Sequence, residues 1–210
     1  MATKKKDKRK PRKPKVDLIA GMPRPKPISF RGTIQHLEQA RDLPILGCWV
    51  MVGWQEQGIT PVIVARLKAD NRVVYGAFVV DIYCLGVKNA LWKTDVSRNR
   101  LDRDLFRMCS GTPEACEASL AHEIIYGAVD YARRYGFEPH RDFAKAVLVL
   151  DPPAVHARIH HVEFGHEGKP LFVSGPYDNA RAIVNQLMRT AGEGNFDYIG
   201  PKAVRSSLDE

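Results

Sequence analysis

The chain lacks any apolar run long enough to span a membrane. No stretch approaches the roughly 18 consecutive apolar residues that a bilayer requires. The charged N-terminus also lacks the apolar segment of a secretory signal. We therefore expect a soluble, cytoplasmic protein with no membrane span.

Cysteine is scarce, and its spacing does not suggest a metal site. The four cysteines form no CxxC pair. Cys48 and Cys84 lie in apolar, strand-like runs, where thiols are commonly buried. Cys109 and Cys116 flank a Gly-Thr-Pro turn, which leaves a disulfide between them open. A reducing compartment with free thiols is the interpretation we favour.

Several catalytic signatures are absent as well. Gly168-Lys169 does not belong to a GxxxxGK[ST] phosphate loop, and His122-Glu123 is not followed by a second histidine at the spacing of zinc proteases. The chain has no internal repeat. The sequence therefore does not identify a catalysed reaction.

Positive charge, in contrast, is concentrated at the N-terminus. The chain has a net charge of +8, and residues 1–30 hold 11 Lys and Arg against 2 Asp. The remaining residues carry 21 basic and 22 acidic groups, a net charge of −1. This distribution indicates a cationic arm joined to a nearly neutral domain.

We expect residues 1–30 to be disordered, because like charges repel and no apolar cluster compensates the entropy of ordering. Such an arm suits the phosphate backbone of RNA, DNA or a ribonucleoprotein, where each neutralised phosphate releases a counterion. The open alternatives are a solubilising tail, a nuclear-import signal and contact with an anionic membrane surface. The candidate phosphate-binding residues are Lys4, Lys5, Lys6, Lys8, Arg9, Lys10, Arg12, Lys13 and Lys15.

Residues 31–198 are expected to form a single α+β domain, followed by a flexible tail over residues 199–210. Apolar runs rich in β-formers predict an antiparallel three-stranded meander. Helical periodicity, caps and prolines predict the helices. The expected strands are Leu46–Trp54, Pro61–Lys68 and Val73–Val87. The expected helices are Thr33–Asp42, Ser97–Met108, Pro113–Tyr135, Arg141–Leu150 and Asp178–Ala191, with a late hairpin of His161–Phe164 and Pro170–Val173.

Residues 86–107, GVKNALWKTDVSRNRLDRDLFR, carry a short resemblance to a known family. The run Arg98-Asn99-Arg100 resembles the RNR segment of the bacterial ribonuclease P protein subunit, in which a basic helix after a sheet contacts RNA. Asp102 and Asp104 interrupt the basic run here. On charge grounds the candidate auxiliary RNA contacts are Arg98, Arg100, Arg103, Arg107 and, at a predicted hairpin tip, Lys169.

Asp81 is the least expected residue, because a carboxylate inside an apolar strand is costly unless it is paired, hydrogen-bonded or bound to metal. RNase H-like nucleases hold Mg²⁺ or Mn²⁺ with acids on a central strand, and Glu123, Asp130 or Asp151 could supply further acids. The first predicted strand carries no acid, however. The alternative interpretation is a structural Asp81 paired with Arg66 or a helix N-terminus.

Three further groups are candidates for a site. The helix face with His122, Tyr126 and Asp130 could work as a general acid–base line, although such faces are usually solvated. Five of the seven histidines fall within residues 140–166, without a standard metal spacing. The turn-rich segments 135–143 and 163–178 could line a pocket into which Lys169, His140, Arg141 and Asp142 reach.

The function favoured by the sequence is an accessory, non-enzymatic protein that associates with nucleic acid, RNA ahead of DNA, and needs no cofactor. A metal-dependent nuclease or other hydrolase using Asp81 with Glu123, Asp130 or His140 is the first alternative. A protein-interaction module, with residues 31–198 as the partner surface, is the second.

Overall fold

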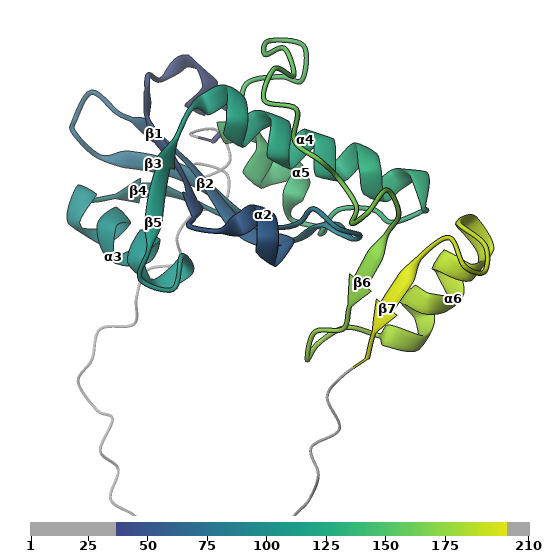
Figure 1. Cartoon of the computed structure of the whole chain (residues 1–210). Helices are drawn as coiled ribbons and strands as arrows, with labels where there is room; N and C mark the ends of the chain where they lie inside the picture. Colours follow the sequence, from purple (N-terminus) through teal and green to yellow (C-terminus); the bar gives the residue numbers. More distant parts are fainter. Residues whose placement is uncertain (1–36, 201–210) are drawn as a thin grey trace, which may run out of the picture.

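The structure is a computed structural model that describes residues 37–200, and the protein is an α+β fold (Figure 1). The predicted basic arm lies outside the described residues, as does the predicted tail from residue 201 onward. Within the described part, no helix combines the length and the apolarity needed to cross a membrane.

Five antiparallel strands form the main sheet in the order β4-β3-β2-β1-β5. The first four strands are a meander, and β5 returns from the far edge to pair with β1. The strands are β1 (Ile45–Met51), β2 (Ile59–Leu67), β3 (Val73–Asp81), β4 (Gly86–Val96) and β5 (Pro113–Cys116).

The prediction of one strand over Val73–Val87 is wrong, because this segment contains the end of β3, a tight turn and the start of β4. Gly86 opens β4 with φ 67°, a left-handed conformation that favours glycine. Strand β4 was not predicted beyond Val87, because polar residues such as Lys88 and Asn89 interrupt its apolar pattern.

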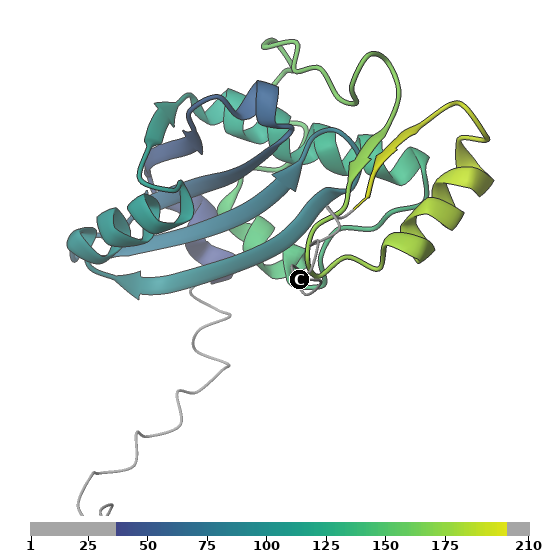
Figure 2. The same ribbon diagram turned by 60° about the horizontal axis from the view of Figure 1, so that its bottom comes forward.

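Side chains alternate between the two faces of the sheet, and each face has its own helical cover (Figure 2). On one face, Val62, Val64 and Phe78 pack with Ile124 and Ala128 of α4 (Ala118–Arg134). On the other face, Ile63, Ala65 and Tyr75 pack with Leu101 and Leu105 of α3 (Arg98–Met108). This two-sided cover accounts for the nearly continuous apolarity of β2 and β3.

The helix predicted over Ser97–Met108 is confirmed as α3. Ser97 is its N-cap, and the Ser97 hydroxyl accepts the amide of Arg100 at 3.3 Å. The helix predicted over Pro113–Tyr135 is correct only from Ala118 onward, since its first four residues form β5. Pro113 is compatible with this strand, because it stands at the first position of an edge strand.

The other helices are shorter than predicted. The segment Arg141–Leu150 forms α5 (Phe143–Ala146) and the 3-10 turn η2 (Val147–Val149). At the start of the described chain lies η1 (Gln39–Asp42), and residues 33–36 of the predicted first helix are outside the described range. The predicted strand Leu46–Trp54 ends at Met51, and α2 (Trp54–Gln57) follows.

The C-terminal part contradicts the predicted hairpin. Strand β6 (Leu171–Val173) pairs in parallel with β7 (Asp197–Ile199), and α6 (Ala180–Thr190) joins them (Figure 1). The expected partner of β6, His161–Phe164, belongs to a loop, and only His166 and Lys169 form an isolated bridge. Phe172 and Leu187 pack with Cys84 and Leu85, so this part closes over the turn between β3 and β4.

Candidate functional site

Asp81 ends β3 and closes the turn that leads to β4. Its Oδ1 accepts the backbone amides of Tyr83 at 3.0 Å and of Cys84 at 2.9 Å. Burial raises the pKa of Asp81 to about 6, against the opposing effect of these amides and of nearby Lys88. The carboxylate is therefore engaged by turn amides, and the alternative pairing with Arg66 is wrong, since Arg66 binds Asp151.

The other nuclease candidates each have a partner of their own. Glu123 binds two backbone amides of the loop after η2, Asp130 pairs with Arg158, and the Nδ1 atom of His140 accepts the amide of Asp142 at 3.3 Å. Among residues 37–200, no group of three His, Cys, Asp or Glu side chains is placed to hold a metal ion. The four predicted catalytic residues thus have separate local roles.

A cavity of about 610 Å³ lies where α2, the β3–β4 turn, the first turn of α4 and the loop 160–167 meet. The apolar wall of this cavity consists of aromatic and aliphatic side chains: Trp54, Ile82, Tyr83 and Leu120. The polar wall comes almost entirely from the loop: His160, His161, Glu163, His166 and Glu167. We name this space the loop cavity.

Glu123 fixes one end of the loop that builds the cavity. This residue of α4 is 3 % exposed, and its two carboxylate oxygens accept the amides of His160 and Val162, each at 2.9 Å. Burial opposes the charge, but the two amides outweigh it and lower the pKa of Glu123. An ionised carboxylate with two backbone donors is a strong anchor, so the loop is held on the helix.

Phe164 and Gly165 fix the other end of the loop. The ring of Phe164 lies against Gly127 of α4, where a Cβ atom would come within 2.3 Å of the ring. The amide of Gly165 donates to the carbonyl of Ile82 at 2.9 Å. Helix α4 and the β3–β4 turn therefore set the shape of the loop together.

Two non-glycine residues of the loop have left-handed backbone. His161 has φ 54° and Glu167 has φ 50°. Such conformations cost free energy and are enriched at functional sites. Both residues line the loop cavity.

The predicted pocket residues Lys169, His140, Arg141 and Asp142 do not line this cavity. Lys169 pairs instead with Asp197 of β7 at 3.1 Å. From the turn-rich segment 163–178, only the part up to Glu167 reaches the cavity. Of the late histidines, His160, His161 and His166 converge on it.

The four arginines of α3 that the sequence analysis named differ in their contacts. Arg98 donates to Asn71 at 3.2 Å, and Arg100 donates to Asp104 at 3.0 Å. Arg103 and Arg107 are exposed and make no ion pair with any residue in the described range. Phe106, 65 % exposed, lies one residue before Arg107 and three after Arg103.

Arg103, Phe106 and Arg107 border a shallow hollow of about 670 Å³ together with Asp102, Ser110 and Gly111. We call this the α3 surface. Asp104 faces away from it: burial alone would raise the pKa of Asp104, but Lys93, Tyr75 and Arg100 bind it and lower the pKa to about 2. Of the two acids that interrupt the basic run, Asp104 therefore neutralises Arg100, while Asp102 is exposed beside Arg103 and Arg107 on the α3 surface.

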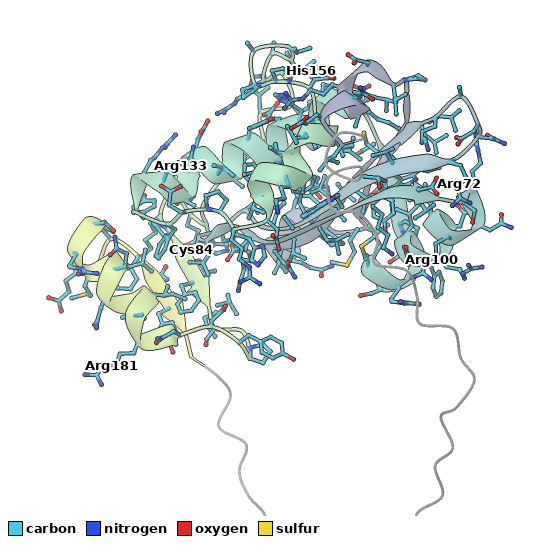
Figure 3. All side chains as sticks on the ribbon, turned by 180° about the vertical axis from the view of Figure 1, so that it is seen from behind. Arg72, Cys84, Arg100, Arg133, His156 and Arg181 are labelled. Carbon is cyan, nitrogen blue, oxygen red and sulfur yellow. The ribbon has the colours of Figure 1, made fainter. Side chains whose placement is uncertain are left out.

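Sequence reasoning missed a buried network around Arg66. Its guanidinium donates to the carbonyls of Val149 and Leu43 at 2.6 and 2.7 Å, and pairs with Asp151 at 2.6 Å. The second carboxylate oxygen of Asp151 meets the Nε2 atom of His156 at 3.0 Å. Figure 3 shows His156 in the loop above the helical layer.

The signal for this network was an arginine within the apolar run PVIVARLK, since a buried guanidinium requires acceptors. The rings of His122 and His156 lie 5.0 Å apart. Burial lowers the pKa of His122, which favours the neutral imidazole. The space beside the network is only about 10 Å³, too small for a ligand. We therefore assign the network a structural role, which is to fix the loop after η2 on β2.

Comparison with known proteins does not assign the chain to a family. No protein-family model, curated protein or solved structure matches the chain.

Proposed function

We propose that the protein is an accessory, nucleic-acid-associated protein, with RNA favoured, whose N-terminal arm binds the phosphate backbone while α3 supplies a second contact. The arm provides the affinity, since residues 1–30 carry a net charge of +9 and the rest of the chain −1. A nearly neutral domain gains little from bulk charge, so any contribution it makes comes from local surfaces.

The observation that carries the proposal is the α3 surface. Arg103 and Arg107 are exposed cations with no carboxylate partner within residues 37–200, and Phe106 presents an exposed ring on the same surface. Arginines contact phosphates, and an aromatic ring stacks with an unpaired base. This combination favours single-stranded nucleic acid, the form in which bases are accessible.

The arm is tested by comparing the full chain with a variant that starts at residue 16. Binding of a single-stranded RNA of mixed sequence is measured by fluorescence anisotropy between about 50 and 200 mM salt. We expect the deletion to remove most of the affinity and most of the salt dependence, with an unchanged melting temperature. Equal affinity of both proteins at equal salt would refute the role of the arm.

The α3 surface is tested by the double variant Arg103→Ala/Arg107→Ala. Its matched control is Arg181→Ala/Arg189→Ala on α6, which removes the same charge from another exposed helix; Arg181 points away from the protein in Figure 3. We expect the α3 variant to weaken RNA binding several-fold more than the control does. Equal losses in both variants would show that only net charge matters and would remove α3 from the proposal.

A further inference from the structure

The loop cavity has features of a binding site that the arm and the α3 surface do not explain. Its volume of about 610 Å³ is in the range of small-molecule sites. We propose that it takes a single unstacked nucleobase with an exocyclic amino group: adenine, guanine or cytosine. This proposal rests on the proposed function, because it assigns to the domain a base-binding site that complements the phosphate contacts of the arm.

The walls of the cavity suit a flat aromatic ligand. Trp54 and Tyr83 line it together with His160, His161 and His166. The rings of Tyr83 and His166 meet edge to face, with centroids 5.2 Å apart. Proteins that bind single-stranded RNA hold splayed bases against such aromatic and imidazole rings.

The negative charge at the cavity favours entry of the base of a nucleotide over entry of its phosphate. Glu163 and Glu167 are exposed at the loop, and neither forms an ion pair with any residue the structure describes. Two carboxylates repel a phosphate, so the phosphate stays outside. Carboxylates accept hydrogen bonds from base amino groups, as they do from the N4 amino group of cytosine. Uracil has no amino group and offers these acceptors only its N3–H group, so it gains less from them.

The cavity is also formed before a ligand arrives. Glu123 holds the amides of His160 and Val162, and Phe164 is fixed against Gly127. The left-handed residues His161 and Glu167 belong to the same held loop. A site with a fixed shape loses less entropy on binding, so a small ligand such as one base can be retained.

The test uses nucleosides, which carry no phosphate and therefore do not report on the arm. Cytidine, guanosine, adenosine and uridine are titrated into the full-length protein, and binding is measured by ligand-observed NMR and by the imidazole resonances of the protein. We expect the three amino-bearing nucleosides to bind about tenfold more tightly than uridine and to shift His160, His161 and His166 but not His140. Equal binding of uridine, or no shift in the loop histidines, would overturn the proposal.

The matched variants are Glu163→Lys/Glu167→Lys in the cavity and Glu114→Lys/Glu193→Lys on exposed positions elsewhere. Both change the net charge by the same amount. We expect only the cavity variant to lose nucleoside binding, while both retain salt-dependent RNA binding through the arm. If the cavity variant does not fold, the nucleoside titration of the unaltered protein still decides the question.

The two proposals fail in different ways. Loss of the arm removes salt-dependent RNA affinity and leaves nucleoside binding in place. Failure of the cavity proposal appears as absent or unselective nucleoside binding in a protein that still binds RNA through its arm.

Discussion

Cys48 of β1 lies directly opposite Cys116 of β5 in the antiparallel ladder, and both thiols are free. Cys116 is therefore next to Cys48, and the disulfide with Cys109 that the sequence left open is not formed. Burial raises the pKa of Cys48 and of Cys116 to about 12 each. The edge strand β5 thus brings one protonated thiol, Cys116, next to another on β1.

We predict that these thiols react slowly in the folded protein. A pKa near 12 leaves a thiolate population about a thousandfold smaller than that of a cysteine at its reference value of 9.0. Alkylation by iodoacetamide at pH 8, followed by mass spectrometry, should therefore be at least about a hundredfold slower in buffer than in urea. Rapid modification of Cys48 in buffer would contradict its buried position.

Asp81→Asn should stabilise the protein at neutral pH. The amide oxygen of asparagine can still accept the turn amides of Tyr83 and Cys84, but the cost of a buried charge is removed. Because the folded-state pKa is raised from 3.8 to about 6, the folded state binds more protons than the unfolded state between these values. Wild-type stability therefore falls as the pH rises from about 4 to 6. We expect a gain of about 3 kcal/mol at pH 7 and none at pH 3 to 4.

Urea unfolding of both proteins at pH 4 and pH 7 measures this gain. A loss of stability at pH 7 would show that the charge of Asp81 is needed by the fold. The same variant tests the nuclease alternative. Metal-dependent RNA cleavage by the wild type that disappears in a folded Asp81→Asn protein would assign catalysis to this residue.

Asp104→Asn should destabilise the protein by about 2 kcal/mol, because it removes the charge that Lys93 and Arg100 bind and leaves one acceptor atom where the hydroxyl of Tyr75, the ammonium of Lys93 and the guanidinium of Arg100 now share two. The folded-state pKa of about 2 lies below the reference value of 3.8. The contribution of Asp104 is thus complete above pH 4 and is lost as the pH falls toward 2. Asp102→Asn on the exposed side of α3 is the control and should change stability by less than about 0.5 kcal/mol. Equal effects of both variants in thermal unfolding would contradict the role of Asp104.

Gly127→Ala should displace Phe164 from α4, since the added methyl group would lie 2.3 Å from the ring. We expect a loss of about 1–3 kcal/mol of stability and weaker nucleoside binding, because the loop loses one of its two attachments. Phe164→Leu in the same chain should recover part of the loss, and a double-mutant cycle measures this coupling. Strictly additive effects would show that the two positions do not contact each other.

Local sequence signals were sufficient for much of the fold. The charged helix after Ser97 has a capping residue and an apolar stripe, and α3 forms there as predicted. The apolar β-branched runs predicted the meander. Strand β4 was missed because its register shifts between Val79 and Val80, and because its polar residues interrupt the alternation that identifies a strand.

The sites depend on contacts that are distant in sequence. Glu123 binds the amides of His160 and Val162, which are 37 and 39 residues later, and Arg66 meets Asp151 across 85 residues. No local pattern encodes such partners, so a polar face on a predicted helix could not be assigned as a loop anchor. The exposed pair Arg103 and Arg107 was within reach of sequence reasoning, but its separation from Arg100 required the position of Asp104.

The position of β5 has a consequence for synthesis of the chain. Strand β1 ends at Met51, but its outer partner begins only at Pro113. While the ribosome is still producing the residues between them, the nascent meander presents an unpaired β1 edge that a second nascent chain could extend. Closure of this edge waits for the chain to return past α3, so synthesis that stalls before residue 113 should yield an aggregation-prone intermediate.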